Sequence, residues 1–85
     1  MDKTETLLLK ETRKWLQKLE KKNIQSPSSK GEVHQHILNI QAYTSDCKHF
    51  LEKKDFIRAF EAIIYAWGIY ETLSNVHLLK ERKED

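Results

Sequence analysis

The stretch Arg58–Glu71, "RAFEAIIYAWGIYE", decides the fold of this chain, because it is apolar on nearly every side. A helix at the surface of a soluble protein normally carries one apolar stripe, and its opposite face is polar. Here one stripe runs through Phe60, Ile63 and Trp67, and Ile64 adds apolar surface on a flank. The stretch therefore predicts a helix that packs against more than one neighbour.

The composition is that of a small, mainly helical domain. The chain has 85 residues, of which 33% are charged and 39% hydrophobic, and a chain of this length forms at most one domain. Two glycines and one proline leave few places for tight turns, so we expect long helices joined by short connections. A formal charge of +2 is too small by itself to indicate nucleic-acid binding. The one cysteine, Cys47, excludes an internal disulfide and a multi-cysteine zinc site.

Two breaks divide the sequence into three predicted helices. The strong break is residues 23–31, "NIQSPSSKG", whose proline, glycine, asparagine and serines favour a loop. The weaker break is residues 53–55, "KKD", in which Asp55 is a good N-cap because its carboxylate accepts a backbone N–H. Ser29 followed by Glu32 predicts a capping box at the start of the second helix. The predicted single domain 1–85 comprises a helix 3–22, a loop 23–29, helices 30–53 and 56–79, and a charged tail 80–85.

Short connections make neighbouring helices antiparallel, so the predicted fold is an all-α, three-helix up-and-down antiparallel bundle. The turn at Lys54 sets the register of the last two helices and brings Tyr43 near Tyr65 and Ile40 near Gly68. Gly68 is expected to let two helix backbones approach closely. Six aromatic residues are expected to supply most of the core burial: Trp15, Tyr43, Phe50, Phe60, Trp67 and Tyr70.

The third helix has more apolar surface than two neighbours in a small bundle can cover. Contiguous exposed apolar surface usually marks an interaction site. We therefore expect a homodimer or a stable protein partner, with the third helix supplying much of the contact. The interface candidates are Ile57, Ile64, Tyr65, Gly68 and Ile69.

A specific pattern of charged, aromatic and glycine positions marks residues 43–71. It consists of a tyrosine, an aspartate three residues on, then "FLEK-x-D", "RAFEA" and "YAWG"; here these are Tyr43, Asp46, Phe50–Lys53, Asp55, Arg58–Ala62 and Tyr65–Gly68. This pattern, which spans about a third of the chain, resembles the archaeal family catalogued as domain of unknown function 357. The resemblance implies a small, cytosolic three-helix bundle of archaeal origin and carries no established activity.

The chain departs from that pattern at two positions. Cys47 stands where a small residue is expected, and it should pack much like alanine as an inert core residue. Lys54 stands where a glycine often precedes the aspartate of the turn. We expect this lysine to make the turn less dependent on a left-handed glycine.

One set of side chains invites a catalytic interpretation. The hairpin register places Asp46 opposite Arg58 and Glu61, which are themselves i, i+3 neighbours. The functional hypothesis is that the two carboxylates act in acid–base catalysis or bind a metal ion. A nearby arginine keeps carboxylates ionised, so a structural ion cluster is the favoured interpretation. No histidine pair has metal-ligand spacing, and we predict neither a catalytic set, nor a metal, nor a cofactor.

The first predicted helix has a cationic outer surface made by Lys10, Arg13, Lys14, Lys18 and Lys21. Such a stripe can hold RNA phosphates, but it is also typical of a solvated helix face. Because Trp15 is assigned to the core stripe, no aromatic side chain is expected on the basic face for base stacking.

The sequence favours an uncharacterised, non-enzymatic protein-interaction or scaffolding module that self-associates through its third helix. The alternative is an RNA-associated helical domain that uses the basic first helix. No secretory signal or membrane-spanning segment is expected, so we predict a cytoplasmic protein with no membrane partner. The loop is long enough for the first helix to pack on its own hairpin or to swap onto a second copy.

Overall fold

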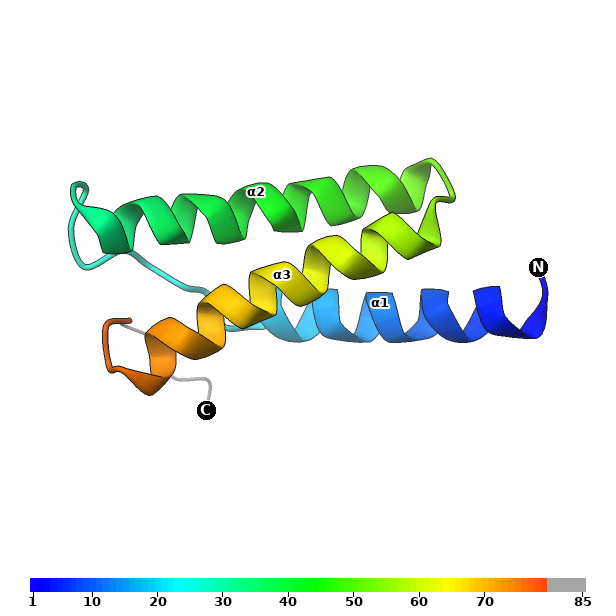
Figure 1. Cartoon of the computed structure of the whole chain (residues 1–85), viewed down its shortest axis with the longest axis horizontal. Helices are drawn as coiled ribbons and strands as arrows, with labels where there is room; N and C mark the ends of the chain where they lie inside the picture. The colour runs from blue at the N-terminus through cyan, green and yellow to red at the C-terminus, as the bar shows by residue number, and fades with distance from the viewer. Residues whose placement is uncertain (80–85) are drawn as a thin grey trace.

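The computed structural model describes residues 1–79 and contains three α-helices: α1 (Lys3–Lys21), α2 (Glu32–Glu52) and α3 (Phe56–Asn75). The chain runs along α1, returns along α2 and runs back along α3, so each helix is antiparallel to the one before it (Figure 1). The prediction of an all-α, three-helix up-and-down bundle is confirmed for these residues. The predicted charged tail 80–85 lies outside the described part of the chain.

Helix α3 is the central element of the fold. It packs against both α2 and α1, whereas α1 and α2 make little contact with each other. Figure 1 shows α3 crossing between the other two helices. This arrangement explains why the stretch Arg58–Glu71 is apolar on so many sides, because two of its faces are covered by different helices.

The core consists mainly of aliphatic and small side chains. Its buried members are Leu16, Leu19, Ile37, Ile40, Cys47, Ala59, Ala62, Ile63, Ala66, Tyr70 and Leu73. Three of them are alanines on α3, and such small side chains let helix axes approach closely at the contact. The aromatic residues that are expected to supply most of the burial lie mainly around this set of small and aliphatic residues. Of the six named for that role, Tyr70 is buried and the other five are half-buried.

The reason lies in the arrangement of the helices. Where α1 and α2 lie apart, the long rings sit at the edges of the two contacts with α3 and cover the small central residues. Trp15 and Trp67 meet edge to face in this way, with their ring centroids 5.5 Å apart. Rings at such an edge keep part of their surface in water.

The α2–α3 hairpin shows the predicted pairing of Tyr43 with Tyr65, but Gly68 does not have its expected role. Tyr43 and Tyr65 stack with ring centroids 5.6 Å apart. Gly68, however, is exposed, and a Cβ placed on it would meet no atom within 4 Å. The expected close approach of two backbones at Gly68 is wrong within the chain, because this residue lies on the outward side of α3, away from both neighbouring helices.

Two of the three helices begin with an aspartate cap. The carboxylates of Asp2 and Asp55 accept the backbone N–H of the residue three positions on, at 2.7 and 3.3 Å. This confirms the cap predicted at Asp55. The capping box predicted for α2 is wrong, because its N-cap is Gly31, at φ 93°, with no side-chain hydrogen bond. The helix starts two residues later than expected because a glycine in this conformation interrupts it.

The last two helices end in the same way, on a residue in the left-handed region. Lys54 follows α2 and His77 follows α3, each with φ 59°. In each case the next N–H returns to the helix, so Asp55 N–H donates to Phe50 O and Leu78 N–H to Leu73 O, both at 2.9 Å. This is the Schellman arrangement. It ends α3 at Asn75, four residues before the predicted end, and Lys54 still adopts the conformation that favours glycine, contrary to expectation.

Candidate functional site

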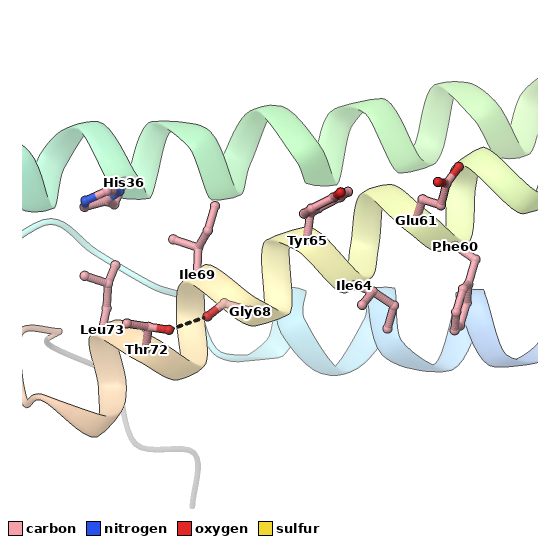
Figure 2. Close-up of a pocket in the computed structure, with 9 residues that line it drawn as sticks. All are labelled: His36, Phe60, Glu61, Ile64, Tyr65, Gly68, Ile69, Thr72 and Leu73. Carbon is pink, nitrogen blue, oxygen red and sulfur yellow. Dashed lines mark hydrogen bonds between the residues drawn. The ribbon is translucent and has the colours of Figure 1, made fainter.

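An apolar groove of about 650 Å³ runs along the outward face of α3. Its lining comprises His36 of α2 and, from α3 itself, Phe60, Glu61, Ile64, Tyr65, Gly68, Ile69, Thr72 and Leu73 (Figure 2). The spacing of these α3 residues follows the i, i+3 and i+4 steps that bring side chains to one side of a helix. We call this concavity the α3 groove.

At the centre of the α3 groove, two projecting side chains are followed by a residue without a side chain. Ile64 and Tyr65 project from the surface, with 43% and 63% of each residue exposed. Gly68 follows one turn later and has no side chain to continue that row. The hydroxyl of Thr72 donates to the Gly68 carbonyl oxygen at 2.9 Å, as Figure 2 shows. Because this polar group is already paired, the surface around the gap is mainly apolar.

Packing on α2 orients the most exposed ring of the groove. Tyr65 stacks on Tyr43 at an interplanar angle of 22°, which restricts the ring without covering its outer side. The structure thus gathers Ile64, Tyr65, Gly68 and Ile69 of the predicted interface set around one hollow. Ile57 does not line the hollow, although 67% of it is exposed.

Sequence reasoning missed three kinds of residue that line the groove. His36 comes from a different helix, so no spacing within α3 indicates it. The sequence pattern places Phe60 in the core and gives Leu73 no role, but both residues line the groove, and Leu73 also belongs to the core. Thr72 carried no apolar signal. The one local pattern that indicates its hydrogen bond to the Gly68 carbonyl oxygen is the i, i+4 spacing of the two residues.

The predicted ion cluster of Asp46, Arg58 and Glu61 does not form around its arginine. The guanidinium of Arg58 pairs with Asp55, at 3.2 Å between Nη1 and Oδ2. Asp55 lies three residues before Arg58 and already caps α3, so this pairing orders fewer torsions than a contact across to α2. Asp46 and Glu61 are both exposed, and neither belongs to an ion pair in residues 1–79. The ion pair that Arg58 makes is therefore local to the start of α3.

A second, basic groove of about 520 Å³ lies on the outer surface of α1. Its lining includes all five predicted basic residues, Lys10, Arg13, Lys14, Lys18 and Lys21, together with Thr6, Leu9 and Gln17. Lys14 also pairs with Glu11 at 3.2 Å. We call this surface the α1 basic groove.

Trp15 packs against the core and does not line the α1 basic groove, but two lysines of that groove reach its ring. Trp67 Nε1 donates to the Trp15 carbonyl oxygen at 2.9 Å, which ties α1 to α3. The ammonium groups of Lys14 and Lys18 lie over the Trp15 ring, 5.1 and 4.9 Å from its centroid. As expected, no aromatic side chain lines the basic groove itself, but two of its lysines reach over the Trp15 ring. The helical spacing put Trp15 on the core stripe, but the ring is only half-buried.

Cys47 is fully buried between the helices. Burial, with a smaller contribution from the negative charge of Glu20, raises the pKa of its thiol to about 11, although Lys48 acts in the opposite direction. The thiol is therefore neutral and inaccessible near neutral pH, which makes it a poor nucleophile. This confirms the expectation of an inert core cysteine.

Residues 1–79 hold no group of three histidine, cysteine, aspartate or glutamate side chains that could bind a metal ion. In the same part of the chain, no helix has the length and apolar character needed to cross a membrane.

Comparisons with known proteins extend the resemblance noted in the sequence. The profile of the family DUF357, described as proteins of unknown function, matches residues 9–79. The crystal structure of protein AF1782 from Archaeoglobus fulgidus, assigned to the same family, is similar with a TM-score of 0.79 and 37% sequence identity. The matched region covers 93% of this chain and 99% of that one. No curated protein matches the chain.

Proposed function

The chain belongs to the DUF357 family of proteins of unknown function, and we propose that it is a non-enzymatic protein-interaction module that forms a homodimer through the α3 groove. The observation that carries this proposal is the exposed step at Ile64 and Tyr65 beside the open space at Gly68. Large exposed apolar patches on small soluble proteins usually mark contact surfaces.

The shape of the groove favours a second copy of the chain as its occupant. A two-fold symmetric interface uses the same patch on both subunits, so the patch must complement itself. The row Phe60, Ile64, Gly68 and Thr72 is an i, i+4 row, the kind of row that interdigitates when two helices cross at about −50°. In such a pair, Ile64 of each copy fills the gap at Gly68 of the other.

A dimer of standard size needs more surface than the α3 groove alone. A standard interface buries about 800 Å² per partner, roughly an eighth of the 6361 Å² surface of this chain. The molecule measures 43 × 27 × 18 Å along its principal axes, and α3 is about 30 Å long at 1.5 Å per residue. An interface of this size therefore has to extend beyond the α3 groove, along the outer face of α3 and onto the adjoining flank of α2.

The test is the mass in solution, measured by light scattering at several concentrations against the 10.1 kDa chain. We expect a dimer, and we expect Ile64→Glu or Tyr65→Glu to give a monomer with unchanged helical circular dichroism. Leu7→Glu is the matched control, because Leu7 is 61% exposed on α1 and does not line the groove. A wild-type monomer, or a dimer that tolerates both α3 variants, would refute the proposal.

Gly68→Ala separates the effect on assembly from the effect on folding. A Cβ at this position meets nothing within its own chain, and alanine stabilises a helix by about 1 kcal/mol relative to glycine. In the proposed dimer the same methyl group occupies the place of the partner's Ile64 and weakens association about tenfold. We expect higher stability of the monomer together with weaker dimerisation, whereas an unchanged dimer would place the interface elsewhere.

A second candidate function, binding of nucleic acid through α1, is favoured by the gathering of all five predicted basic residues around one groove. Contacts to phosphates make such binding fall steeply with salt. We expect the triple variant Lys14→Glu, Lys18→Glu and Lys21→Glu to abolish binding of a fluorescent RNA in an anisotropy titration at low salt. Retention of binding by this variant would end this candidate.

A further inference from the structure

We propose that the α1 basic groove takes single-stranded nucleic acid and that Trp15 is the platform on which one of its bases stacks. The inference rests on the second candidate function and adds the class of ligand and the residue that distinguishes it. Proteins that bind single strands without sequence preference combine a positively charged groove with aromatic rings that stack on bases. Both parts of such a site are present on α1, where two lysines of the charged groove reach over the Trp15 ring.

The charges form a continuous row. Lys10, Arg13, Lys14, Lys18 and Lys21 follow one another at steps of one, three or four residues, so they cover about 16 Å of helix axis at 1.5 Å per residue. No acidic residue lines the groove. Lys10, Arg13 and Lys21 belong to none of the ion pairs of residues 1–79, so their charges are not neutralised by neighbours there. Four of the five cations are lysines, whose flexible stems can follow an irregular phosphate chain.

The Trp15 ring is held in place before any ligand arrives. The backbone carbonyl of Trp15 accepts the Trp67 indole N–H, which fixes this turn of α1 against α3. The Trp15 ring itself packs on the Trp67 ring at an interplanar angle of 81°. The ammonium groups of Lys14 and Lys18 lie about 5 Å from its centroid. A base that stacks on the ring displaces these ammonium groups from the indole, and the adjacent phosphates then receive them. The same two lysines therefore connect the stacking platform with the row of charges.

The other classes of polyanion match fewer of these features. The bases of a duplex stay stacked inside the helix, so they offer no free face to Trp15. An anionic membrane surface requires an apolar helix face that can enter the lipid, but the apolar side of α1 is used inside the protein, where Leu16 and Leu19 are buried. An acidic peptide supplies negative charge, but its acidic side chains carry no aromatic ring that could stack on the Trp15 indole.

The experiment compares three probes at low salt: a single-stranded oligonucleotide of about 12 nucleotides, the duplex of the same sequence, and inorganic polyphosphate. Tryptophan fluorescence of the intact chain reports stacking, and the Trp67→Phe variant assigns the signal to Trp15. We expect the single strand to quench this fluorescence and to bind about tenfold more tightly than the duplex. Polyphosphate should bind without comparable quenching.

Trp15→Leu and Trp15→Phe complete the test, with circular dichroism as the check on folding. We expect the leucine variant to bind the single strand about tenfold more weakly, and the phenylalanine variant to recover most of the loss because it keeps a ring. Equal binding of all three probes without quenching overturns the role of Trp15 while the electrostatic candidate function stands. No binding of any probe at low salt overturns both.

Discussion

Helix α3 holds its two neighbours in different ways. It meets α2 through small buried residues such as Ala62 and Cys47 and through a short turn, so partners along this contact are close in sequence. It meets α1 across a long separation, through the Trp15–Trp67 contact and a hydrogen bond between residues 52 positions apart. The hairpin is therefore specified largely by local sequence, whereas the position of α1 depends on a few large side chains.

This difference implies unequal stability within the molecule. Closing a longer loop costs more conformational entropy, and α1 has little contact with α2 that would compensate. One contact between α1 and α2 is the surface ion pair of Glu20 with Lys48. Exposed pairs of this kind contribute about 1 kcal/mol or less to stability. We therefore expect α1 to separate from the bundle more readily than α2 separates from α3.

The largest expected effect comes from Trp67→Ala. It removes the contact with Trp15, the hydrogen bond to the Trp15 carbonyl oxygen and an edge contact with Tyr70. We expect a loss of about 3 kcal/mol in the free energy of unfolding, measured by urea denaturation. Hydrogen exchange should then show α1 losing protection before α2 and α3. Trp67→Phe, which keeps a ring but no N–H, should lose about 1 kcal/mol, and equal loss of protection in all three helices would contradict the comparison.

The next effect concerns the α2–α3 contact at alkaline pH. Burial raises the pKa of Cys47 from 9.0 to about 11, so the folded state holds the thiol proton more tightly than the unfolded state does. The resulting stabilisation is complete below about pH 9 and is lost as pH rises towards 11, by about 2–3 kcal/mol in total.

Urea denaturation between pH 8 and about 11 measures this loss, and Cys47→Ala is the control. Tyrosines and lysines titrate in the same range in both proteins, so the difference between the two pH profiles isolates the thiol. We expect the alanine variant to show the shallower decline. Parallel profiles would mean that the thiolate is accommodated inside the bundle.

A smaller effect separates the two aspartate caps. Asp55 caps α3 and also pairs with Arg58, whereas Asp2 caps the free end of α1. We expect Asp55→Ala to lower the melting temperature through a loss of about 1 kcal/mol. Asp2→Ala should cost less, because the first turn of α1 is largely exposed and frays at little cost. An equal or larger effect of Asp2→Ala would show that α1 is held along its whole length.

The smallest expected effect is a gain in stability at the hairpin turn. Lys54 has φ 59°, a conformation in which a side chain is strained and glycine is not. We expect Lys54→Gly to raise the free energy of unfolding by about 0.5–1 kcal/mol. The matched substitution Lys53→Gly, at φ −81°, should lower it. A loss at both positions would mean that the lysine side chain contributes to the turn.

Much of the fold could be predicted because it depends on neighbours along the chain. The 3.6-residue period identified three helices, the loop residues separated α1 from α2, and Asp55 marked the start of α3. The end of α3 was misjudged because His77 takes a left-handed conformation that the residue type does not favour. The α3 groove was partly foreseen from its surplus of apolar residues, but His36 was not, because its place there depends on how α2 lies against α3.

The sequence by itself determined that this chain forms three amphipathic helices, that the third is apolar on several sides, and that the first carries a row of cations. These properties follow from residue spacing, since side chains three and four apart share a side of a helix. Only the tertiary structure decided which apolar residues are covered. It left Gly68 exposed on the outward side of α3 and placed the Trp15 ring beneath two lysines, because burial is set by contacts between segments distant in the chain.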